Sequence, residues 1–314
     1  MTAGPRAAPT AQRRSMLAMH RVTTVSELRS ELDQARAGGS SVGLVPTMGY
    51  LHEGHLSLAS AAARECDVVV MTIFLNPLQF APEEDLDSYP RDPEGDAGKA
   101  GSAGVSILFS PTASEMYPNG RDAVMTGVEV AGLSSVMEGV ARRTHFGGVC
   151  TVVAKLFNIV GPCRAYFGEK DYQQLAIVRR MATDLSFPVE VVGCPIVRES
   201  DGLAMSSRNV YLTAEERSVA PVLRRALHLG AAAIRTGTTD ADEVRTLMRS
   251  EIQAAALGDL DYVEVADPRT LAPLRVAGDQ ARLFVAVRFG RARLIDNVAV
   301  DQVEPTGPFP LLAP

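Results

Sequence analysis

The chain has 314 residues, 46% of them hydrophobic, which predicts a globular protein of about two domains with a conventional core. A net charge of −6 without long basic runs argues against a nucleic-acid surface, and no apolar run reaches the roughly 18 residues of a membrane span. Four cysteines without a CxxC motif favour reduced thiols and a cytoplasmic location over zinc or disulfides. Residues 1–15 lack the apolar core of a secretory signal and are expected to form a disordered tail.

Strand-like and helical segments alternate along the first two thirds of the chain. Apolar residues recur at helical spacing from Thr23 to Ala37, and Gly38-Gly39 supplies the stop. Later helices are predicted at 55–65, 94–103, 145–160 and 172–185, and strands at 42–45, 68–75, 105–109, 164–167 and 189–192. This alternation predicts an α/β domain at residues 16–196, a Rossmann-like parallel sheet with helices on both faces.

The composition changes after about Pro195. Two helices are predicted there, at 214–235 and 241–256, followed by strands at 262–266, 282–287 and 294–300. Residues 197–314 are therefore expected to form a smaller C-terminal α+β domain. In the first domain, ligands are expected at the carboxyl ends of the parallel strands.

Two of the five histidines lie in one turn, in Pro46-Thr-Met-Gly-Tyr-Leu-His-Glu-Gly-His55. Because a strand is predicted before this turn and a helix after it, His52 and His55 should share one face at a helix N-terminus. Backbone N–H groups and the helix dipole there suit a phosphate, and Gly54 allows a base or ribose to approach the backbone. In the alternative interpretation, His52 is a loop residue and His55 an ordinary first-turn residue.

A second polar segment, Phe74-Leu-Asn-Pro-Leu-Gln-Phe80, follows another predicted strand. The amides of Asn76 and Gln79 can both donate and accept hydrogen bonds, so they can bind a hydroxyl or a carboxylate. The alternative is that they cap a turn.

A third segment, Phe167-Gly-Glu-Lys-Asp-Tyr-Gln-Gln174, joins a predicted strand to a helix. Lys170 is a point charge suited to phosphate, and Gln174 follows one turn along the helix. Asp171 is suited either to a magnesium-bound water or to capping the helix, and the sequence leaves both roles open.

The fourth feature is the polar loop Gly202-Leu-Ala-Met-Ser-Ser-Arg-Asn209. Ser206, Ser207 and Arg208 can surround a polyphosphate, although a solvated connection would have a similar composition. Arg142 and His145 precede a predicted apolar helix, where His145 could be a simple first-turn residue. Histidines, lysine and the serine/arginine loop make three phosphate-directed elements, and we expect them on one rim.

With these segments in place, the chain resembles the pantothenate synthetase (pantoate–β-alanine ligase) family of the nucleotidyltransferase superfamily. The HxGH box alone is typical of the whole superfamily, whereas the Pro-Thr-Met-Gly before it and the later motifs are typical of this family. The matching segments are Pro46-Thr-Met-Gly, His52-Glu-Gly-His55, Asn76-Pro-Leu-Gln79-Phe, Asp85-Leu-Asp-Ser-Tyr-Pro-Arg91, His145-Phe-Gly-Gly-Val149, Phe167-Gly-Glu-Lys-Asp-Tyr-Gln-Gln174, Met205-Ser-Ser-Arg-Asn209, Asp261-Tyr and Leu294-Ile-Asp-Asn.

The resemblance implies a two-step ligation. ATP and (R)-pantoate give pantoyl-adenylate and pyrophosphate, and the amine of β-alanine then displaces AMP. It implies the catalytic residues His52, His55, Lys170, Ser206, Ser207 and Arg208. It also implies Mg²⁺ bridging the phosphates, without a confident protein ligand, and a homodimer.

The same resemblance implies two sets of binding residues. Adenosine is expected against the backbone of Met48, Gly168 and Val197, and pantoate against Gln79 and Gln174, with β-alanine near Gln79. The full ATP-binding set is Pro46, Thr47, Met48, His52, Gly54, His55, Gly168, Lys170, Asp171, Val197, Met205, Ser206, Ser207 and Arg208. The substrate-binding set is Gln79, Gln174, Asn76 and Met48.

The sequence departs from the family pattern at three places. Tyr50 stands where a small residue is expected, and Arg143 where proline is common. Gly95 interrupts an acidic run that has been proposed to hold magnesium in relatives, which leaves only Asp96 there. Two other functions are weighed against the ligase: an adenylyltransferase that stops after AMP transfer, and a catalytically inactive nucleotide-binding module. The retained phosphate-directed residues argue against the second.

Overall fold

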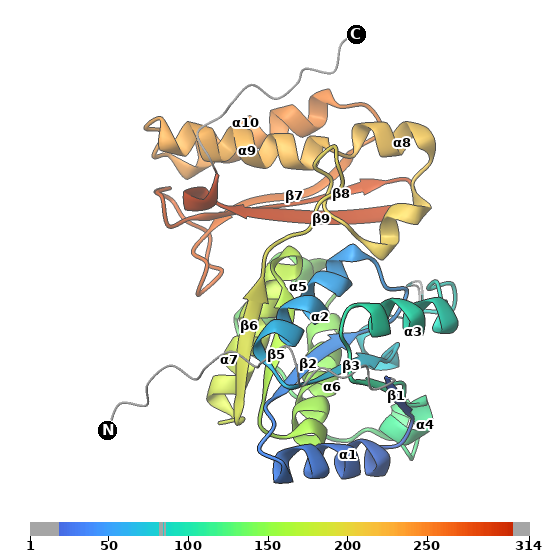
Figure 1. Cartoon of the computed structure of the whole chain (residues 1–314). Helices are drawn as coiled ribbons and strands as arrows, with labels where there is room; N and C mark the ends of the chain where they lie inside the picture. The colour runs from blue at the N-terminus through green and yellow to red at the C-terminus, as the bar shows by residue number, and fades with distance from the viewer. Residues whose placement is uncertain (1–18, 82–83, 85, 304–314) are drawn as a thin grey trace. The chain divides into compact units, whose positions relative to one another are not determined.

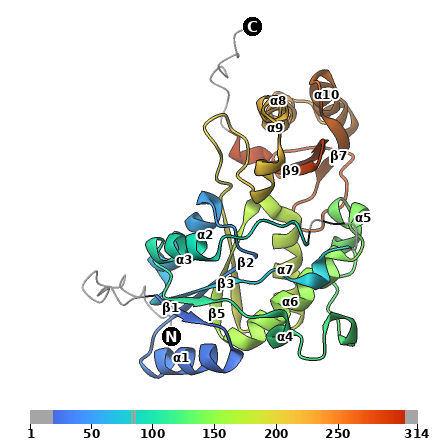
Figure 2. The ribbon, with the colours of Figure 1, turned by 90° about the vertical axis from the view of Figure 1, so that its right-hand side faces the viewer.

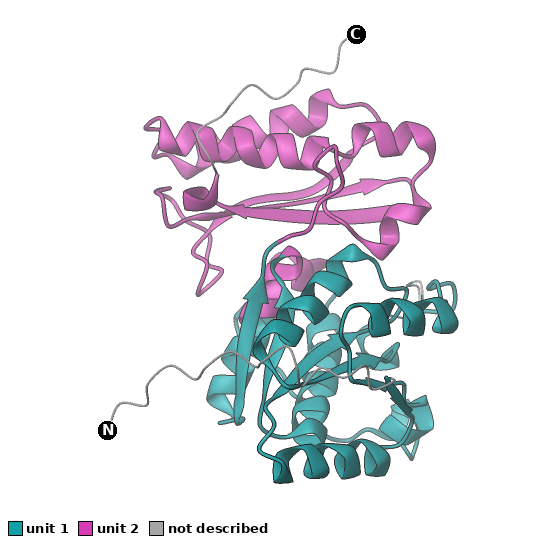
Figure 3. Ribbon diagram, in the orientation of Figure 1, with its two compact units in different colours: residues 1–134, 142–169, 177–195 teal, residues 135–141, 170–176, 196–314 magenta. Residues whose placement is uncertain are grey.

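The predicted alternation of strands and helices is confirmed in a computed structural model, which describes residues 19–81, 84 and 86–303 (Figure 1). The expected tail at residues 1–15 lies outside this range. Contacts divide the chain into two units, drawn in different colours in Figure 3. Unit 1 consists of residues 1–134, 142–169 and 177–195, and unit 2 of residues 135–141, 170–176 and 196–314.

Six strands of unit 1 form a parallel sheet in the order β1-β4-β3-β2-β5-β6. The chain runs from β2 outward to β3 and β4, and then returns to the other side of β2 for β5 and β6. The winding therefore reverses beside β2, and open α/β sheets bind ligands at the strand ends of such a point. The strands are β1 (His20–Val22), β2 (Val42–Thr47), β3 (Val68–Ile73), β4 (Ile107–Phe109), β5 (Cys163–Gly168) and β6 (Val189–Cys194).

Helices cover both faces of this sheet, as predicted. Right-handed crossovers in opposite directions put α2 and α3 on one face and α6 on the other, which Figure 2 shows. None of the described helices is both long and apolar enough to span a membrane. The helices that begin in this part of the chain are α1 (Val25–Ala37), α2 (Glu53–Glu65), α3 (Pro93–Ser102), α4 (Ala113–Met116), α5 (Glu138–Ala141), α6 (His145–Val160) and α7 (Tyr172–Asp184).

Local sequence explains the start of α1. The Thr24 hydroxyl accepts a hydrogen bond from the Glu27 N–H, and the Glu27 carboxylate accepts one from the Thr24 N–H. Leu28 and Leu32 then bury one face of the helix. Strand β1 was not predicted, because three residues are too few to show a period.

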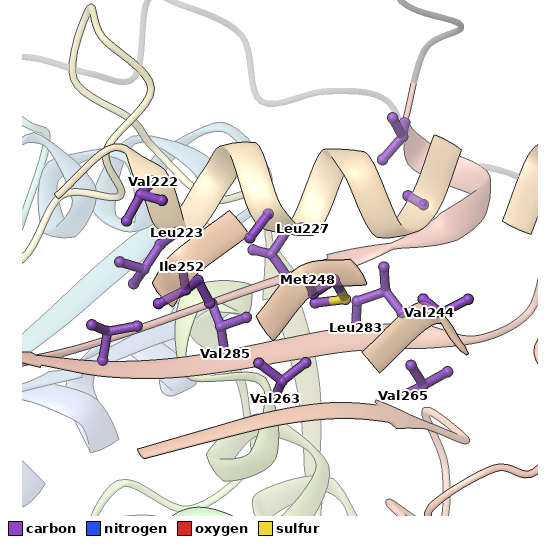
Figure 4. Packing of buried hydrophobic residues seen from close by; sticks show 14 of the residues in the cluster. Val222, Leu223, Leu227, Val244, Met248, Ile252, Val263, Val265, Leu283 and Val285 are labelled. Carbon is purple, nitrogen blue, oxygen red and sulfur yellow. The ribbon is translucent and has the colours of Figure 1, made fainter. Parts of the chain in front are cut away.

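Unit 2 contains a three-stranded antiparallel sheet in the order β7-β8-β9, which confirms the smaller α+β part. Figure 4 shows Val244, Met248 and Ile252, spaced four residues apart on one helix, packed with Val263 and Val285 of the sheet. The elements are α8 (Ala214–Val219), α9 (Val222–Arg235), α10 (Ala241–Ala254), β7 (Asp259–Ala266), β8 (Arg282–Phe289) and β9 (Ala292–Ala299).

The prediction of one helix over 214–235 is wrong. The helix is interrupted between α8 and α9, at Ala220-Pro221. Proline has no N–H for the helical ladder, and its ring clashes with the preceding turn, so Pro221 ends one helix and stands at the start of the next.

Two short segments from the first half of the chain belong to unit 2. The Glu138 carboxylate accepts hydrogen bonds from Arg293 at 2.6 and 2.8 Å and from the Tyr262 hydroxyl at 2.9 Å. The Tyr172 ring lies 3.6 Å from the Arg282 guanidinium carbon. These contacts hold residues 135–141 and 170–176 against the strands of unit 2.

Candidate functional site

The turn after β2 places both histidines at the start of α2. His52 is the N-cap, and its Nδ1 accepts a hydrogen bond from the Gly54 N–H at 3.1 Å. His55, three residues on, accepts one at Nδ1 from the His52 N–H at 3.3 Å. The ring centroids are 4.0 Å apart, so the two imidazoles lie together, as the i, i+3 spacing predicted. The two histidines form a capping box, a role that is usually filled by Ser or Thr with Glu.

This arrangement fixes the tautomer of both rings. A backbone N–H can only donate, so each Nδ1 must be an acceptor and the ring proton of each neutral imidazole lies on Nε2. Each histidine thereby carries an Nε2–H donor on the side of the ring away from the helix cap. Two such donors at a helix N-terminus suit a phosphate oxygen on which negative charge grows.

The predicted ATP-binding residues before the histidines are half-buried or buried, at the end of β2 and in the turn that follows it. Thr47 is buried, and its hydroxyl donates to the Thr72 carbonyl at 2.6 Å and accepts from the Gly49 N–H at 3.2 Å. Its side chain therefore fixes the turn. Pro46 and Met48 are half-buried, and Gly168 ends β5, the neighbour of β2 in the sheet.

The turn after β3 carries the two predicted amides. Gln79 is buried; its Oε1 accepts from the Asn76 Nδ2 at 3.1 Å and its Nε2 lies 3.0 Å from the Met48 sulfur. Asn76 also donates to the Gly148 carbonyl, and its Oδ1 accepts from the Tyr117 hydroxyl and the Leu78 N–H. All four hydrogen-bonding positions of Asn76 are thus used inside the protein. In this structure the Asn76 amide is therefore fully used within the protein, and its contact with substrate stays a prediction.

The start of α6 holds this glutamine turn from the other side. His145 Nδ1 lies 3.0 Å from the Gln79 carbonyl oxygen, and Arg142 donates to the same oxygen at 3.4 Å. Arg142 also pairs with Glu84 at 2.5 and 2.9 Å. Burial alone would raise the pKa of Glu84, but hydrogen bonding and attraction by Arg142 leave that pKa lowered. His145 therefore lies in the first turn of α6 and also contacts the backbone of Gln79.

Close packing explains the second glycine of the His145-Phe-Gly-Gly motif, Gly148. A Cβ at this position would lie 2.3 Å from the Leu78 carbonyl oxygen and 2.5 Å from the Gln79 nitrogen. Only glycine therefore allows α6 to pack on the backbone beside Gln79. Arg143, the departure from the family pattern, is exposed.

In unit 2, the predicted lysine is tied to β9. Asn297 donates from Nδ2 to the Lys170 carbonyl at 2.9 Å and accepts from Arg282 at 2.5 Å. The Lys170 ammonium lies 3.3 Å from the Asp171 carboxylate, which makes that aspartate an ion-pair partner. Gln174 is half-buried in the first turn of α7. Its neighbour Gln173 is buried, accepts a hydrogen bond from the Glu138 N–H and donates one to the Val136 carbonyl.

The serine/arginine loop is an ordered hairpin of unit 2. The Met205 N–H donates to the Val197 carbonyl at 3.0 Å, and Asn209 donates to Glu199 at 2.8 Å. Ser206 caps the turn of residues 207–211 by accepting from the Arg208 N–H, and Ser207 is buried. Residues 207–211 lie beside β9.

Asp296 and Asn297 of β9 therefore support both elements of unit 2 that the sequence predicts to bind phosphate. Asp296 accepts from Arg198 at 2.6 and 3.0 Å, at the base of the hairpin, and Asn297 holds the Lys170 backbone. Sequence reasoning missed this role, although the motif Leu294-Ile-Asp-Asn was noted. A polar Asp-Asn pair in the middle of an apolar strand was the available signal.

The predicted residues thus fall into two sets, each held together within its own unit. Unit 1 carries the histidines and Gln79 with the turns after β2, β3 and β5. Unit 2 carries Lys170, Asp171, Gln174, Val197, Met205, Ser206, Ser207 and Arg208. That both sets face one bound ATP stays a prediction. Among the described residues, no group of three or more His, Cys, Asp or Glu side chains is arranged to hold a metal ion.

Similarity to known proteins covers almost the whole described chain. A family model described as pantoate-beta-alanine ligase matches residues 20–299. The chain is 52% identical over 283 residues to the pantothenate synthetase of Moorella thermoacetica, covering 90% of this chain and 99% of that protein. It is 50% identical over 280 residues to the pantothenate synthetase of Pelotomaculum thermopropionicum, covering 89% and 98%.

Solved structures show the same similarity. A crystal structure of pantothenate synthetase from Thermus thermophilus matches with a TM-score of 0.84 at 51% identity, covering 90% of this chain and 99% of that one. A pantoate-beta-alanine ligase from Francisella tularensis, complexed with beta-gamma ATP and β-alanine, matches with a TM-score of 0.74 at 30% identity, covering 91% and 99%.

Proposed function

The chain belongs to the pantoate-beta-alanine ligase family, and we infer that it joins (R)-pantoate to β-alanine in an ATP-dependent reaction that yields pantothenate, AMP and pyrophosphate. The observation that carries the mechanism is the pairing of two features at neighbouring strand ends of unit 1. One is the His52 and His55 capping box after β2. The other is the buried Gln79 amide after β3, which contacts Met48 of the histidine turn.

In the first step, a carboxylate oxygen of pantoate attacks the α-phosphorus of ATP, the P–O bond to pyrophosphate breaks, and pantoyl-adenylate forms. Negative charge grows on the phosphate oxygens, and the Nε2–H groups of His52 and His55 donate to them. Lys170, Ser206, Ser207 and Arg208 supply further donors in this proposal. In the second step, the β-alanine amine attacks the acyl carbon, AMP leaves with the bridging oxygen, and the amine loses a proton.

Binding assignments follow from side-chain chemistry and from the family. The Gln79 and Gln174 amides hold the hydroxyl and carboxylate oxygens of pantoate, and β-alanine binds near Gln79. Asn76 acts behind Gln79 by fixing its orientation. The backbones of Met48, Gly168 and Val197 bind the adenosine. No protein nucleophile is required, so orientation and electrostatics lower the barrier.

ATP enters as its magnesium complex, with the ion on the phosphates as part of the substrate. No protein ligand for magnesium is assigned: Asp96, the acidic residue left in that region, accepts two backbone hydrogen bonds, and among the described residues no three His, Cys, Asp or Glu side chains are grouped to hold a metal ion. A homodimer and a cytoplasmic location complete the proposal and rest on the family alone. Sedimentation of the purified chain tests the dimer.

The test is a two-stage assay of product release. With ATP and pantoate alone, one equivalent of pyrophosphate should appear per active site, and AMP should appear only when β-alanine is added. Pyrophosphate release without pantoate would reject the ligase in favour of an adenylyltransferase with another acceptor. The absence of any pyrophosphate release would leave only a nucleotide-binding module.

A further inference from the structure

Two side chains of helix α3 hydrogen-bond to the backbone immediately before His52. The Asp96 carboxylate, with 1% of the residue exposed, accepts hydrogen bonds from the Tyr50 N–H at 2.7 Å and the Leu51 N–H at 2.6 Å. One turn further along α3, the Lys99 ammonium donates to the Leu51 carbonyl at 2.9 Å. Both polar groups of Leu51 are therefore fixed by α3, and the carbonyl belongs to the peptide bond that leads into His52.

The turn that contains Gly49 and Tyr50 has an unusual backbone conformation. Gly49 has a φ of +91° and Tyr50 a φ of +51°, a left-handed conformation that a tyrosine seldom adopts. Successive N–H groups in such a turn point to the same side and form a concave site for an anion, which Asp96 fills. Gly49 also leaves room for it, since a Cβ there would lie 3.1 Å from the carboxylate. The shape of the turn therefore depends on Asp96.

We propose that Asp96, supported by Lys99, is a positioning residue that sets the orientation of His52 and His55 for adenylate formation. The inference rests on the proposed function. His52 directly follows Leu51 and is the first residue of the capping box. A shift of the Leu51 peptide therefore moves the Nε2–H groups of both histidines. Misplacement of a catalytic group by about 1 Å can cost on the order of 100-fold in rate. Both carboxylate oxygens are engaged with backbone donors, which distinguishes this role from magnesium binding.

The experiment compares Asp96→Asn with Glu94→Gln in the full-length enzyme. Glu94 lies in the first turn of the same helix, is mostly exposed and pairs with Arg21, so it controls for the loss of a negative charge near the helix start. Asparagine keeps one acceptor but presents its NH₂ group to a backbone N–H. With ATP, pantoate and β-alanine all present, we expect a fall of about 10- to 100-fold in kcat for pyrophosphate release, and less than twofold for the control.

Two further readouts separate positioning from other roles. In a His55→Ala background, Asp96→Asn should cost less than about threefold more, because residues that act as a unit are not additive. The Mg²⁺ concentration for half-maximal rate should not change. The proposal would be overturned if the rate loss of the double variant equalled the product of the two single losses. A raised Mg²⁺ requirement, or a lowered Tm of Asp96→Asn with unchanged kcat, would also overturn it.

If Asp96→Asn does not fold, Lys99→Met tests the same peptide from its carbonyl side. It should lower kcat for adenylation by several-fold and leave the KM for β-alanine within twofold, and an unchanged kcat would overturn the proposal. A wild-type enzyme without pantoate-dependent pyrophosphate release would instead reject the proposed function, so the two failures are distinguishable.

Discussion

In the proposed mechanism the two nitrogens of His55 have separate roles, and two substitutions can separate them. In His55→Asn, the side-chain oxygen occupies about the position of Nδ1 and can still accept from the His52 N–H, but no donor remains at the position of Nε2. In His55→Gln, the amide NH₂ reaches about the position of Nε2, and the cap acceptor is lost. We expect the first variant to lose rate and the second to lose stability.

The magnitudes follow from the hydrogen bonds involved. Loss of one preorganised donor to a developing oxyanion costs on the order of 10²–10³ in rate, which is about 2.7–4 kcal/mol. Loss of a helix-cap acceptor costs about 0.5–2 kcal/mol of stability, and the 3.3 Å length of this bond favours the lower end. In a chain of 314 residues, this loss corresponds to a Tm decrease of about 1–3 °C, with about 1 °C at the lower end.

The assay is single-turnover pyrophosphate release with ATP and pantoate, combined with thermal unfolding of each variant. His55→Asn should keep a Tm close to that of the wild type and adenylate on the order of 100 to 1,000 times more slowly. His55→Gln should melt lower and react at least several-fold faster than His55→Asn. Near-normal adenylation by His55→Asn would refute the assignment of the Nε2–H donor.

Three other changes test the rest of the site. Tyr117→Phe removes a hydroxyl whose pKa is raised by burial and which donates to the amide behind Gln79, so the KM for pantoate should rise several-fold with little change in the KM for ATP; an unchanged pantoate KM would contradict this. Gly148→Ala should destabilise the protein by about 1–3 kcal/mol, as overpacking does, whereas Gly147→Ala, with open space around its Cβ, should not, and equal Tm values would refute the packing argument. The pKa of His228 is lowered by burial and by nearby arginines, so the unfolded state binds the proton more readily and stability should fall as pH drops below about 6.5. His228→Gln should therefore flatten the dependence of Tm on pH between about pH 7 and 5.5. Parallel Tm profiles of the variant and the wild type would count against this role of His228.

Sequence patterns predicted the elements with strong local signals. The parallel sheet, the helix at 145–160 and the antiparallel C-terminal strands were found where the periods indicated, because these segments bury a continuous face. The break at Pro221 was missed because the helical period continues across it. Strand β1 was missed because its three residues are too few to show a period.

The site was predictable in residue type and less so in role. Two histidines three apart indicated a helix N-terminus, but not that they cap it with Nδ1. Asn76 appeared equivalent to Gln79, and only the hydroxyl of distant Tyr117 shows that one amide is saturated. Asp96 and Asn297 act through backbone groups that are about 45 and 127 positions away, a kind of contact that no local period encodes.

Transfer of labelled oxygen tests the central claim most directly. With ¹⁸O in the pantoate carboxylate, attack on the α-phosphorus followed by amine attack on the acyl carbon leaves one labelled oxygen in AMP. We expect one ¹⁸O per AMP formed and none in pyrophosphate, measured by mass spectrometry after a single turnover with β-alanine. Unlabelled AMP, or label in pyrophosphate or phosphate, would contradict an adenylate intermediate and the assignment of His52 and His55 to the α-phosphate.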